Sequence, residues 1–418
     1  MANSEVIPAS GKAPEFPEHV DHWNNWIRAN NHCSTSLQII KPKSASKITV
    51  AQFYMLRTLY IKPQSSDRLE KDLSIDYNKA KTALANCPLW KDYRNSFTEG
   101  YTSRQMFGLA RLYQQRSAHL LIGNRKTRRA FYLYKPEELC EAQVSVRAEG
   151  EEEEEEADLE RTLITESSFL SEISTVEYDT IEESHGVEDE EIVNFALVLF
   201  ANSLIRATSS VDVDGDWLPC RSSFKVKFEN KKLYRALVDG IFRVEKVSEE
   251  KTGEQLKQCQ RLDKTGSTTS QANGNDESTY KLSTNSRTTA IMEVKRKSRS
   301  NTENWCVDIF YQEAGEMAAW IAEVPVLLDQ KPDHDGTYRR LLLSQDQREV
   351  YVTIATYTEK YISYILHSVH KPAYAEGTLT TDDFLRMYPY GPFRVDVLED
   401  MEQLARVLIA LSYQNFVI

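Results

Sequence analysis

Paired cysteines are missing from this sequence of 418 residues. Its six cysteines are spread singly along the chain, and no two stand at the Cys-X-X-Cys spacing of zinc ribbons and redox motifs. This spacing argues against a zinc ribbon and against a disulfide framework. We therefore expect reduced thiols that pack as small hydrophobic side chains.

Long hydrophobic runs are missing as well. The longest apolar stretches, FALVLFA and AAWIAEVPVLL, are too short or too interrupted to span a bilayer. The N-terminus MANSEVIPASGK lacks the charged-then-apolar order of a secretory signal. We expect no membrane association and an intracellular location, nuclear or cytoplasmic. The glycine-rich loops GXGXXG and GXXXXGK[ST] are also absent, which disfavours nucleotide binding through such loops.

Acidic residues exceed basic ones, and the net charge is −12, but the acid is unevenly spread. Between Glu141 and Glu191, 20 acidic residues stand against two basic ones, and 49 basic and 43 acidic residues remain elsewhere. Like charges at this density repel and resist burial, so we interpret residues 141–189 as an acidic linker. An interaction tail for a basic protein partner is the alternative. Because the remainder is mildly basic, the net charge does not exclude nucleic acid as a partner.

Composition divides the rest of the chain into three parts. Residues 1–18 are small and polar, and we expect a disordered tail. Residues 19–140 carry apolar residues at three- and four-residue spacing, which predicts a mainly helical N-terminal region where a protein partner could bind. Residues 190–418 contain helix and strand patterns and enclose a polar segment, about 248–287, that we interpret as a disordered insertion. The order of patterns predicts an α/β fold with one mixed sheet flanked by helices.

Two acidic residues and a lysine carry the candidate chemistry. Asp239 lies in the apolar context LVDGIF, where a carboxylate is costly unless it ends a strand, is paired or binds metal. Gly240 after it indicates a bend. Glu293 and Lys295 are two residues apart on the strand AIMEVKRK, so alternation places both on one face. The ordinary alternatives are a turn or salt-bridge role for Asp239 and an exposed strand face for the other two.

Hard cations suit this set of side chains. Mg²⁺ prefers a few carboxylate oxygens, retained waters and a phosphate oxygen, so Asp239 and Glu293 are candidate ligands for Mg²⁺, with Mn²⁺ as a substitute. Such an ion lowers the pKa of a bound water and neutralises phosphate charge. Lys295 would orient that water, accept its proton or stabilise the developing charge, and the sequence leaves these three roles open.

The helix pattern that follows, DIFYQEAGEMAAWIAEV, adds a polar face. Gln312, Glu316 and Glu323 lie on the side opposite to its apolar face, which places Gln312 to reach the site or a nucleic-acid backbone. We interpret the basic run KRKSR, which ends at Arg299, as a strand end that meets phosphate. A nuclear localisation signal is the alternative.

The series VDGIF, IMEVKRK and YQEAGEMAAWI resembles the D…ExK…Q pattern of the PD-(D/E)XK nuclease superfamily. More narrowly, the region from about Glu190 to Asn415 is similar to a fungal branch of nuclease-like proteins, some fused to kinase-like domains in spore-killer meiotic drivers. Kinase motifs are absent here. The resemblance implies a restriction-endonuclease-like core, and it assigns a site role to Glu191 in the opening helix EEIVNFALVLFANSLI. The motif aspartate and glutamate are 54 positions apart, which is long for this pattern, and the polar insertion accounts for most of the separation.

The sequence therefore predicts a metal-dependent nuclease that hydrolyses phosphodiester bonds of DNA, with RNA as the less favoured substrate. Asp239 and Glu293 would bind the metal, and Lys295 would act on the water. Gln312 and Glu191 would support them. The alternative is a catalytically silent nuclease-fold protein that binds other proteins or nucleic acid.

Overall fold

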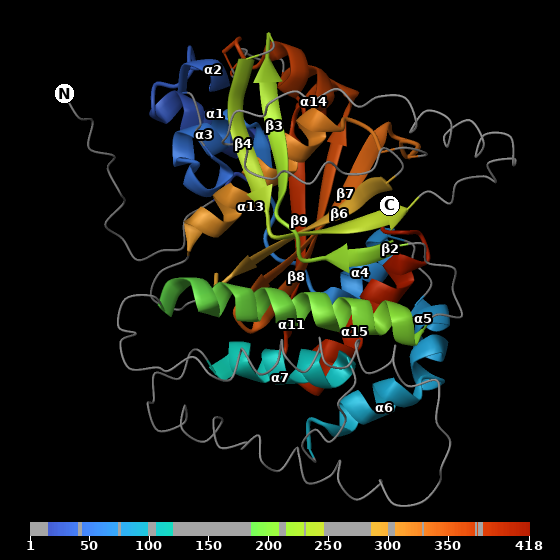
Figure 1. The fold of residues 1–418 in the computed structure, drawn as a ribbon. Coiled ribbons are helices and arrows are strands. Elements are labelled where there is room, and N and C mark those ends of the chain that lie inside the picture. The colour runs from blue at the N-terminus through green and yellow to red at the C-terminus, as the bar shows by residue number, and fades with distance from the viewer. Residues whose placement is uncertain are drawn as a thin grey trace, which may run out of the picture. The chain divides into compact units, whose positions relative to one another are not determined.

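The fold is a mixed α/β structure with a seven-stranded sheet, as the sequence predicted at this coarse level (Figure 1). The computed structural model of the chain describes residues 16–40, 44–73, 77–98, 106–119, 185–208, 215–229, 231–245, 286–299, 306–327, 330–372, 374 and 379–418. Residues 1–15 of the predicted tail, the acidic linker up to residue 184 and most of the predicted insertion lie outside these residues. The end of the predicted tail is ordered, because Phe16 packs against Phe53 and Phe310 and the carbonyl of Pro17 accepts from the N–H of Tyr60 at 3.0 Å. Residues 185–189 of the predicted linker are helical.

Short helices dominate the N-terminal part. Its elements are α1 (Val20–Ala29), α2 (Leu37–Ile40), the 3₁₀ turn η1 (Ala45–Lys47), α3 (Val50–Met55), β1 (Thr58–Tyr60), α4 (Ser66–Leu73), α5 (Tyr77–Ala85), α6 (Pro88–Asn95) and α7 (Met106–His119). Local sequence explains where some of them begin. Thr49 and Gln52 form a reciprocal capping box at the start of α3, and Pro88 occupies the first turn of α6, where its missing N–H is not needed.

Longer elements follow in the C-terminal part. They are α11 (His185–Ala207), β2 (Gly215–Leu218), β3 (Ser222–Phe228), β4 (Lys231–Val238), β5 (Gly240–Glu245), β6 (Ser286–Lys295), α13 (Val307–Glu323), β7 (Thr337–Asp346), β8 (Glu349–Thr358), α14 (Glu359–Ser363), the π-helical turn η2 (Tyr364–Ser368), the 3₁₀ turn η3 (Thr381–Asp383), β9 (Leu385–Arg394) and α15 (Leu398–Ser412). No helix among the described residues is both long and apolar enough to cross a membrane.

The main sheet has the strand order β1-β9-β8-β7-β6-β5-β2, and β3 with β4 forms a separate hairpin. Its pairs are antiparallel except for β1 with β9 and β6 with β7. The parallel pair β6–β7 is connected through α13, because parallel neighbours need a crossover and a helix supplies it. The central strands are rich in Val, Ile, Leu, Thr and Tyr and are buried almost throughout, as strands covered on both faces are.

The N-terminal helices do not form a region apart from the sheet. Met1–Ala118 and Glu190–Ile418 together make one compact unit, and His119–Asp189 make another. Strand β1 pairs with β9, although more than 300 residues separate them in sequence. The described N-terminal helices therefore belong to the same unit as the sheet. A strand of three residues is too short for alternation to reveal it.

Helix α13 is buried on nearly all sides, including most of the side that its pattern predicted to be polar. Hairpin β3–β4, η1 and α3 also contact it. Tyr234 on β4 donates a hydrogen bond to the carbonyl of Gly315 at 2.8 Å. A side chain at Gly315 would collide with Ile48, since an added Cβ would stand 2.1 Å from its Cδ1 atom. The helix is thus a central element that carries polar residues into the interior.

The predicted insertion overlaps strand β6, which begins at Ser286 rather than after residue 287. Glu245 and Ser286 are paired neighbours in the β5–β6 ladder. The two ends of the intervening segment are therefore already adjacent.

We predict that deleting residues 248–283 leaves the thermal unfolding midpoint unchanged. The four remaining residues, 246, 247, 284 and 285, suffice for a hairpin loop between Glu245 and Ser286. The deleted sequence has too little apolar content to offset the entropy of ordering it. Differential scanning calorimetry tests this, with a Gly/Ser segment of equal length as the control. A midpoint many degrees lower in the deletion variant alone would show that the segment packs on the core.

Candidate active site

Asp239 stands where the chain leaves hairpin β3–β4 and enters the main sheet. Its backbone N–H donates to the carbonyl of Met292 at 3.0 Å, and its carboxylate Oδ2 accepts from the N–H of Val294 at 3.2 Å. Gly240, the first residue of β5, pairs with Met292, so the register places Asp239 opposite Glu293. The predicted bend is confirmed, and the two carboxylates share one face of the sheet.

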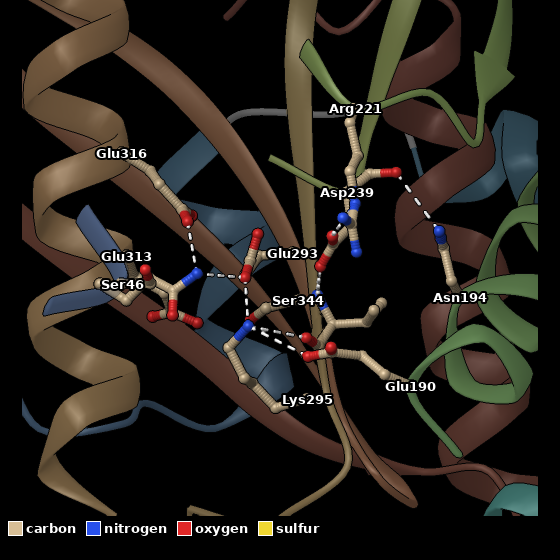
Figure 2. Close-up of polar contacts among 12 residues, drawn as sticks. Ser46, Glu190, Asn194, Arg221, Asp239, Glu293, Lys295, Glu313, Glu316 and Ser344 are labelled. Carbon is tan, nitrogen blue, oxygen red and sulfur yellow. Dashed lines mark hydrogen bonds and ion pairs between the residues drawn. The ribbon is translucent and has the colours of Figure 1, made fainter. Parts of the chain in front are cut away.

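Glu293 and Lys295 contact each other at the end of β6, which confirms their predicted common face (Figure 2). The Lys295 ammonium donates to Glu293 Oε1, to the carbonyl of Val294 at 3.0 Å and to Glu190 Oε1 at 3.4 Å. The Glu293 side chain is 2% exposed and that of Lys295 is 20% exposed. The end of the strand is therefore largely enclosed.

Gln312 reaches the site from α13, as predicted. Its Nε2 donates to Glu293 Oε1 at 2.5 Å and to Glu316 Oε1 at 2.7 Å. Glu316, placed on the polar side by the helix pattern, is fully buried, because the hairpin covers that side. The second oxygens of Glu293 and Glu316 are buried without a hydrogen-bond partner. Two carboxylates thus meet through one amide, and each retains an unused oxygen.

Helix α11 supplies Glu190, not Glu191, to the site. The Glu191 side chain is exposed, whereas Glu190 meets Lys295. One residue turns a helix by about 100°, so neighbouring residues face different directions. Asn194, four residues after Glu190, lies on the same helix face and donates to the carbonyl of Asp239 at 3.3 Å. The role carried to Glu191 by resemblance is therefore corrected to its neighbour.

Burial dominates the electrostatics of these groups. It raises the pKa of Glu293 to about 8, although Lys295 acts in the opposite direction. Burial, and then repulsion from Glu293, raises the pKa of Glu316 far above its ordinary value. The pKa of Asp239 is also raised by burial. The Lys295 ammonium, with the exposed guanidinium of Arg221 3.9 Å from Asp239, therefore faces four carboxylates, and burial favours the protonated form of Asp239, Glu293 and Glu316.

Lys295 itself is held in its charged form. Burial lowers its pKa, but attraction by Glu293 and Glu316 outweighs this and leaves the pKa above the ordinary value for lysine. A general base needs a pKa near the working pH. Of the three roles that the sequence left open, proton acceptance fits these surroundings least, and charge stabilisation fits them best.

A second buried ion network lies beside the first one, around Arg299. This guanidinium, 1% exposed, donates to Glu313 at 2.6 Å, to Asp346 and to Ser344 Oγ at 2.9 Å. Tyr60 OH donates to the other Glu313 oxygen at 2.5 Å. Arg299 is therefore not available for phosphate, contrary to our interpretation of the run KRKSR. Its neighbours Arg296 and Lys297 are exposed.

The chemistry of the first cluster fits a hard cation. Within the described ranges, no three or more His, Cys, Asp or Glu side chains are grouped so that they could hold a metal ion. Mg²⁺ often takes only one or two protein carboxylates and completes its shell with water and substrate phosphate. Asp239 and Glu293 provide that number, and Glu293 Oε2 is a buried oxygen that lacks a partner. The residues present therefore suit Mg²⁺ together with a phosphate, and not a closed protein cage.

The four described cysteines, Cys33, Cys87, Cys220 and Cys306, are free thiols. This agrees with the expectation of reduced, structural cysteines. Cys140 and Cys259 lie outside the described residues.

Known proteins do not extend these observations. Comparisons with family models, curated proteins and solved structures find no match for this chain. The likeness to PD-(D/E)XK nucleases therefore rests on the motif residues and stays a prediction. Any function has to be argued from the side chains at the site.

We predict that Arg299→Met lowers the free energy of unfolding by about 3–5 kcal/mol, since it leaves Glu313 and Asp346 as uncompensated buried carboxylates. Urea unfolding followed by circular dichroism measures the change. The matched control is Arg296→Met, which removes an exposed cation three residues earlier. Equal stability of the two variants would contradict the structural role of Arg299.

We also predict that, in EDTA, the free energy of unfolding falls as pH rises from about 5 to about 8. Glu293 ionises near its ordinary value of 4.5 when unfolded but near 8 when folded, so the folded state binds more protons across this window. Glu316→Gln should make the decline smaller, because it removes a second buried acid of the same kind. Chemical unfolding at several pH values measures the slope, with the exposed Glu191→Gln as control. A slope that Glu316→Gln leaves unchanged would contradict the raised pKa.

Proposed function

We propose that this chain is a metal-dependent nuclease with a restriction-endonuclease-like core, acting on DNA in preference to RNA. The observation that carries the proposal is the meeting of Asp239, Glu293 and Lys295 at the end of β6. A pure scaffold has no physical need for so many carboxylates around one ammonium. The order β5, β6, α13, β7, with β6 and β7 parallel, is in keeping with the D…ExK…Q resemblance.

Each of these side chains has a distinct task in the proposed reaction. Asp239 and Glu293 would hold Mg²⁺, which when bound supplies an acidified water and neutralises phosphate charge. Gln312 fixes the orientation of Glu293 through its hydrogen bond, and the N–H of Val294 does the same for Asp239. Lys295 donates to Glu190 as well as to Glu293, so its ammonium lies between the two carboxylates.

The charge of Lys295 determines what it does to the substrate. Its raised pKa keeps the ammonium protonated, so it would donate hydrogen bonds and not remove a proton. Oriented donors in a water-poor site stabilise negative charge that develops on phosphate oxygens. The 20% exposure of its side chain leaves part of the lysine within reach of solvent and substrate.

The alternative is a nuclease-fold protein without turnover. The Lys295–Glu293–Glu190 ion pairs would then be structural, since buried ion pairs also perturb pKa values. The two functions differ in one measurable respect, which is metal-dependent cleavage of nucleic acid.

We predict that Lys295→Met lowers the cleavage rate of DNA by roughly 10²–10³-fold, the usual loss when one charge-stabilising donor is removed. Methionine keeps most of the volume, but it leaves Glu293 and Glu190 without their cation, so circular dichroism has to establish that the variant is folded before its rate is compared. Lys295→Arg should retain part of the activity, and Glu191→Gln should cut as fast as wild type. Single-turnover cleavage of plasmid, linear and single-stranded DNA, and of RNA, in Mg²⁺, Mn²⁺ or EDTA provides the rates.

Two results would contradict this proposal in different ways. A wild type that cuts none of these substrates in either metal would leave the interaction protein as the better reading. A Lys295→Met variant that cuts at the wild-type rate would place the chemistry at other residues of a true nuclease. Glu293→Gln separates metal binding from turnover, because its loss should be partly recovered at higher Mg²⁺ concentration.

A further inference from the structure

The two faces of hairpin β3–β4 differ in character. Its inward side chains, among them Phe224, Val226 and Tyr234, are buried. The outward face carries Lys225, Lys227, Lys232 and Arg235, which we call the basic face, together with the exposed Leu237. All three lysines are exposed, and Arg235 is partly exposed.

Like charges stand directly opposite each other on this basic face. The register pairs Lys225 with Arg235 and Lys227 with Lys232. Such cross-strand pairs destabilise a hairpin, and opposite charges would stabilise it. Arg235 Nε donates to Ser223 Oγ at 2.7 Å, and Glu323 accepts from the backbone N–H of Lys225 at 2.7 Å, so neither contact neutralises a lysine side chain. The arrangement is unfavourable for folding alone, and an anionic partner would remove the repulsion.

We propose that the basic face binds the phosphate backbone of the nucleic acid on which the site acts. The identity of the polymer rests on the proposed function, but binding by this face does not require turnover.

The hairpin leads directly into the candidate site. Strand β4 ends at Val238, and the next residue is Asp239. Arg221, just before β3, is 72% exposed and its Nε lies 3.9 Å from Asp239 Oδ1. Cations therefore stand at the Asp239 end of the hairpin, as Arg221, and further along it, as the pairs Lys225–Arg235 and Lys227–Lys232. A partner bound along this row would also reach the carboxylates.

A nucleic-acid strand fits this row better than an acidic protein does. Side chains on one face of a strand repeat about every 7 Å, so the basic face offers cations at regular intervals. Phosphates repeat regularly along a nucleic-acid strand, and their contacts with Lys and Arg are independent of base sequence. The hairpin leads directly to Asp239, where the proposed function places phosphodiester hydrolysis. A nucleic-acid strand bound to the basic face would have phosphates both on the hairpin and at that site.

The basic face has a fixed position relative to the site. Tyr234 is hydrogen-bonded to Gly315 of α13, and the rings of Phe224 and Trp320 lie 6.1 Å apart. Helix α13 is the element that carries Gln312 and Glu316. A nucleic-acid strand bound to the hairpin would therefore have a fixed position relative to the carboxylates.

The test compares two triple variants of the full chain that lose the same charge. Lys225→Gln, Lys227→Gln and Lys232→Gln neutralise the basic face. Lys71→Gln, Lys81→Gln and Lys91→Gln neutralise exposed lysines of α4, α5 and α6. Fluorescence anisotropy measures binding of a duplex of about 30 base pairs and of a single strand, in EDTA and at several salt concentrations. EDTA prevents cleavage, so binding is measured alone.

We predict that the hairpin variant binds duplex at least tenfold more weakly at low salt, with a salt slope smaller by roughly three, near 0.9 for each lost phosphate contact. The control variant should bind like wild type. The hairpin variant should melt at or above the wild-type temperature, because its opposed charges are gone.

Three results would overturn the inference. They are equal weakening in both triple variants, unchanged binding in the hairpin variant, and equally tight binding of poly-glutamate at the same charge concentration. A wild type that binds through the basic face but never cuts supports this inference while removing the proposed nuclease. A wild type that cuts while the hairpin variant binds normally removes this inference alone.

Discussion

One buried ammonium surrounded by four carboxylates is the constraint on which the rest of the site depends. Lys295 bonds Glu293 and Glu190, while Asp239 and Glu316 complete the cluster. Lys295 and the exposed Arg221 beside Asp239 do not balance four ionised carboxylates, and moving ionised carboxylates out of water is expensive. The excess negative charge can be removed in two ways, by protonation of carboxylates or by binding of a cation. The charge of the cluster therefore depends on pH and on cation concentration.

The neighbouring Arg299 network shows what a structural solution looks like in the same fold. Arg299 donates to Glu313, Asp346 and the Ser344 hydroxyl, and the Tyr60 hydroxyl donates to Glu313, while Asp346 Oδ1 stays buried without a hydrogen-bond partner. Burial raises the pKa of Asp346 to about 6, although Arg299 acts against this. Here one cation meets two acids and is shielded from solvent on every side. The Lys295 cluster has twice the acid and a partly exposed cation, and this difference separates a candidate site from a scaffold.

Local sequence rules predicted those parts of the site that depend on one element. Alternation along one strand gave the common face of Glu293 and Lys295, and the VDG sequence gave the bend at Asp239. The misses each needed tertiary information. Glu316 lies one turn after Gln312, so the spacing placed the two together. What the spacing could not reveal is that a hairpin some 80 residues earlier covers that side of α13.

Other misses had different physical causes. Glu190 and Glu191 are adjacent residues within helix α11, and only packing decides which of them faces β6. Strand β1 has three residues and pairs with a strand near the C-terminus, so no local pattern could identify it. Arg299 belongs to a basic run that looks solvent-exposed, and its carboxylate partners come from α13 and β7. The sequence therefore indicated local features of single helices and strands. It did not indicate which charged residues from distant segments meet in the interior.

The hairpin connects the two electrostatic properties of the molecule. Its apolar side covers α13 and so excludes water from Glu316, which raises the pKa of that acid and sharpens the charge imbalance. A site so rich in carboxylates repels a phosphate polymer unless a local positive field offsets it. The outward side of the same hairpin provides such a field, in cations that repel one another in the absence of an anion. Burial of the acids and attraction of the substrate would then both follow from the alternation of apolar and basic residues in one pair of strands.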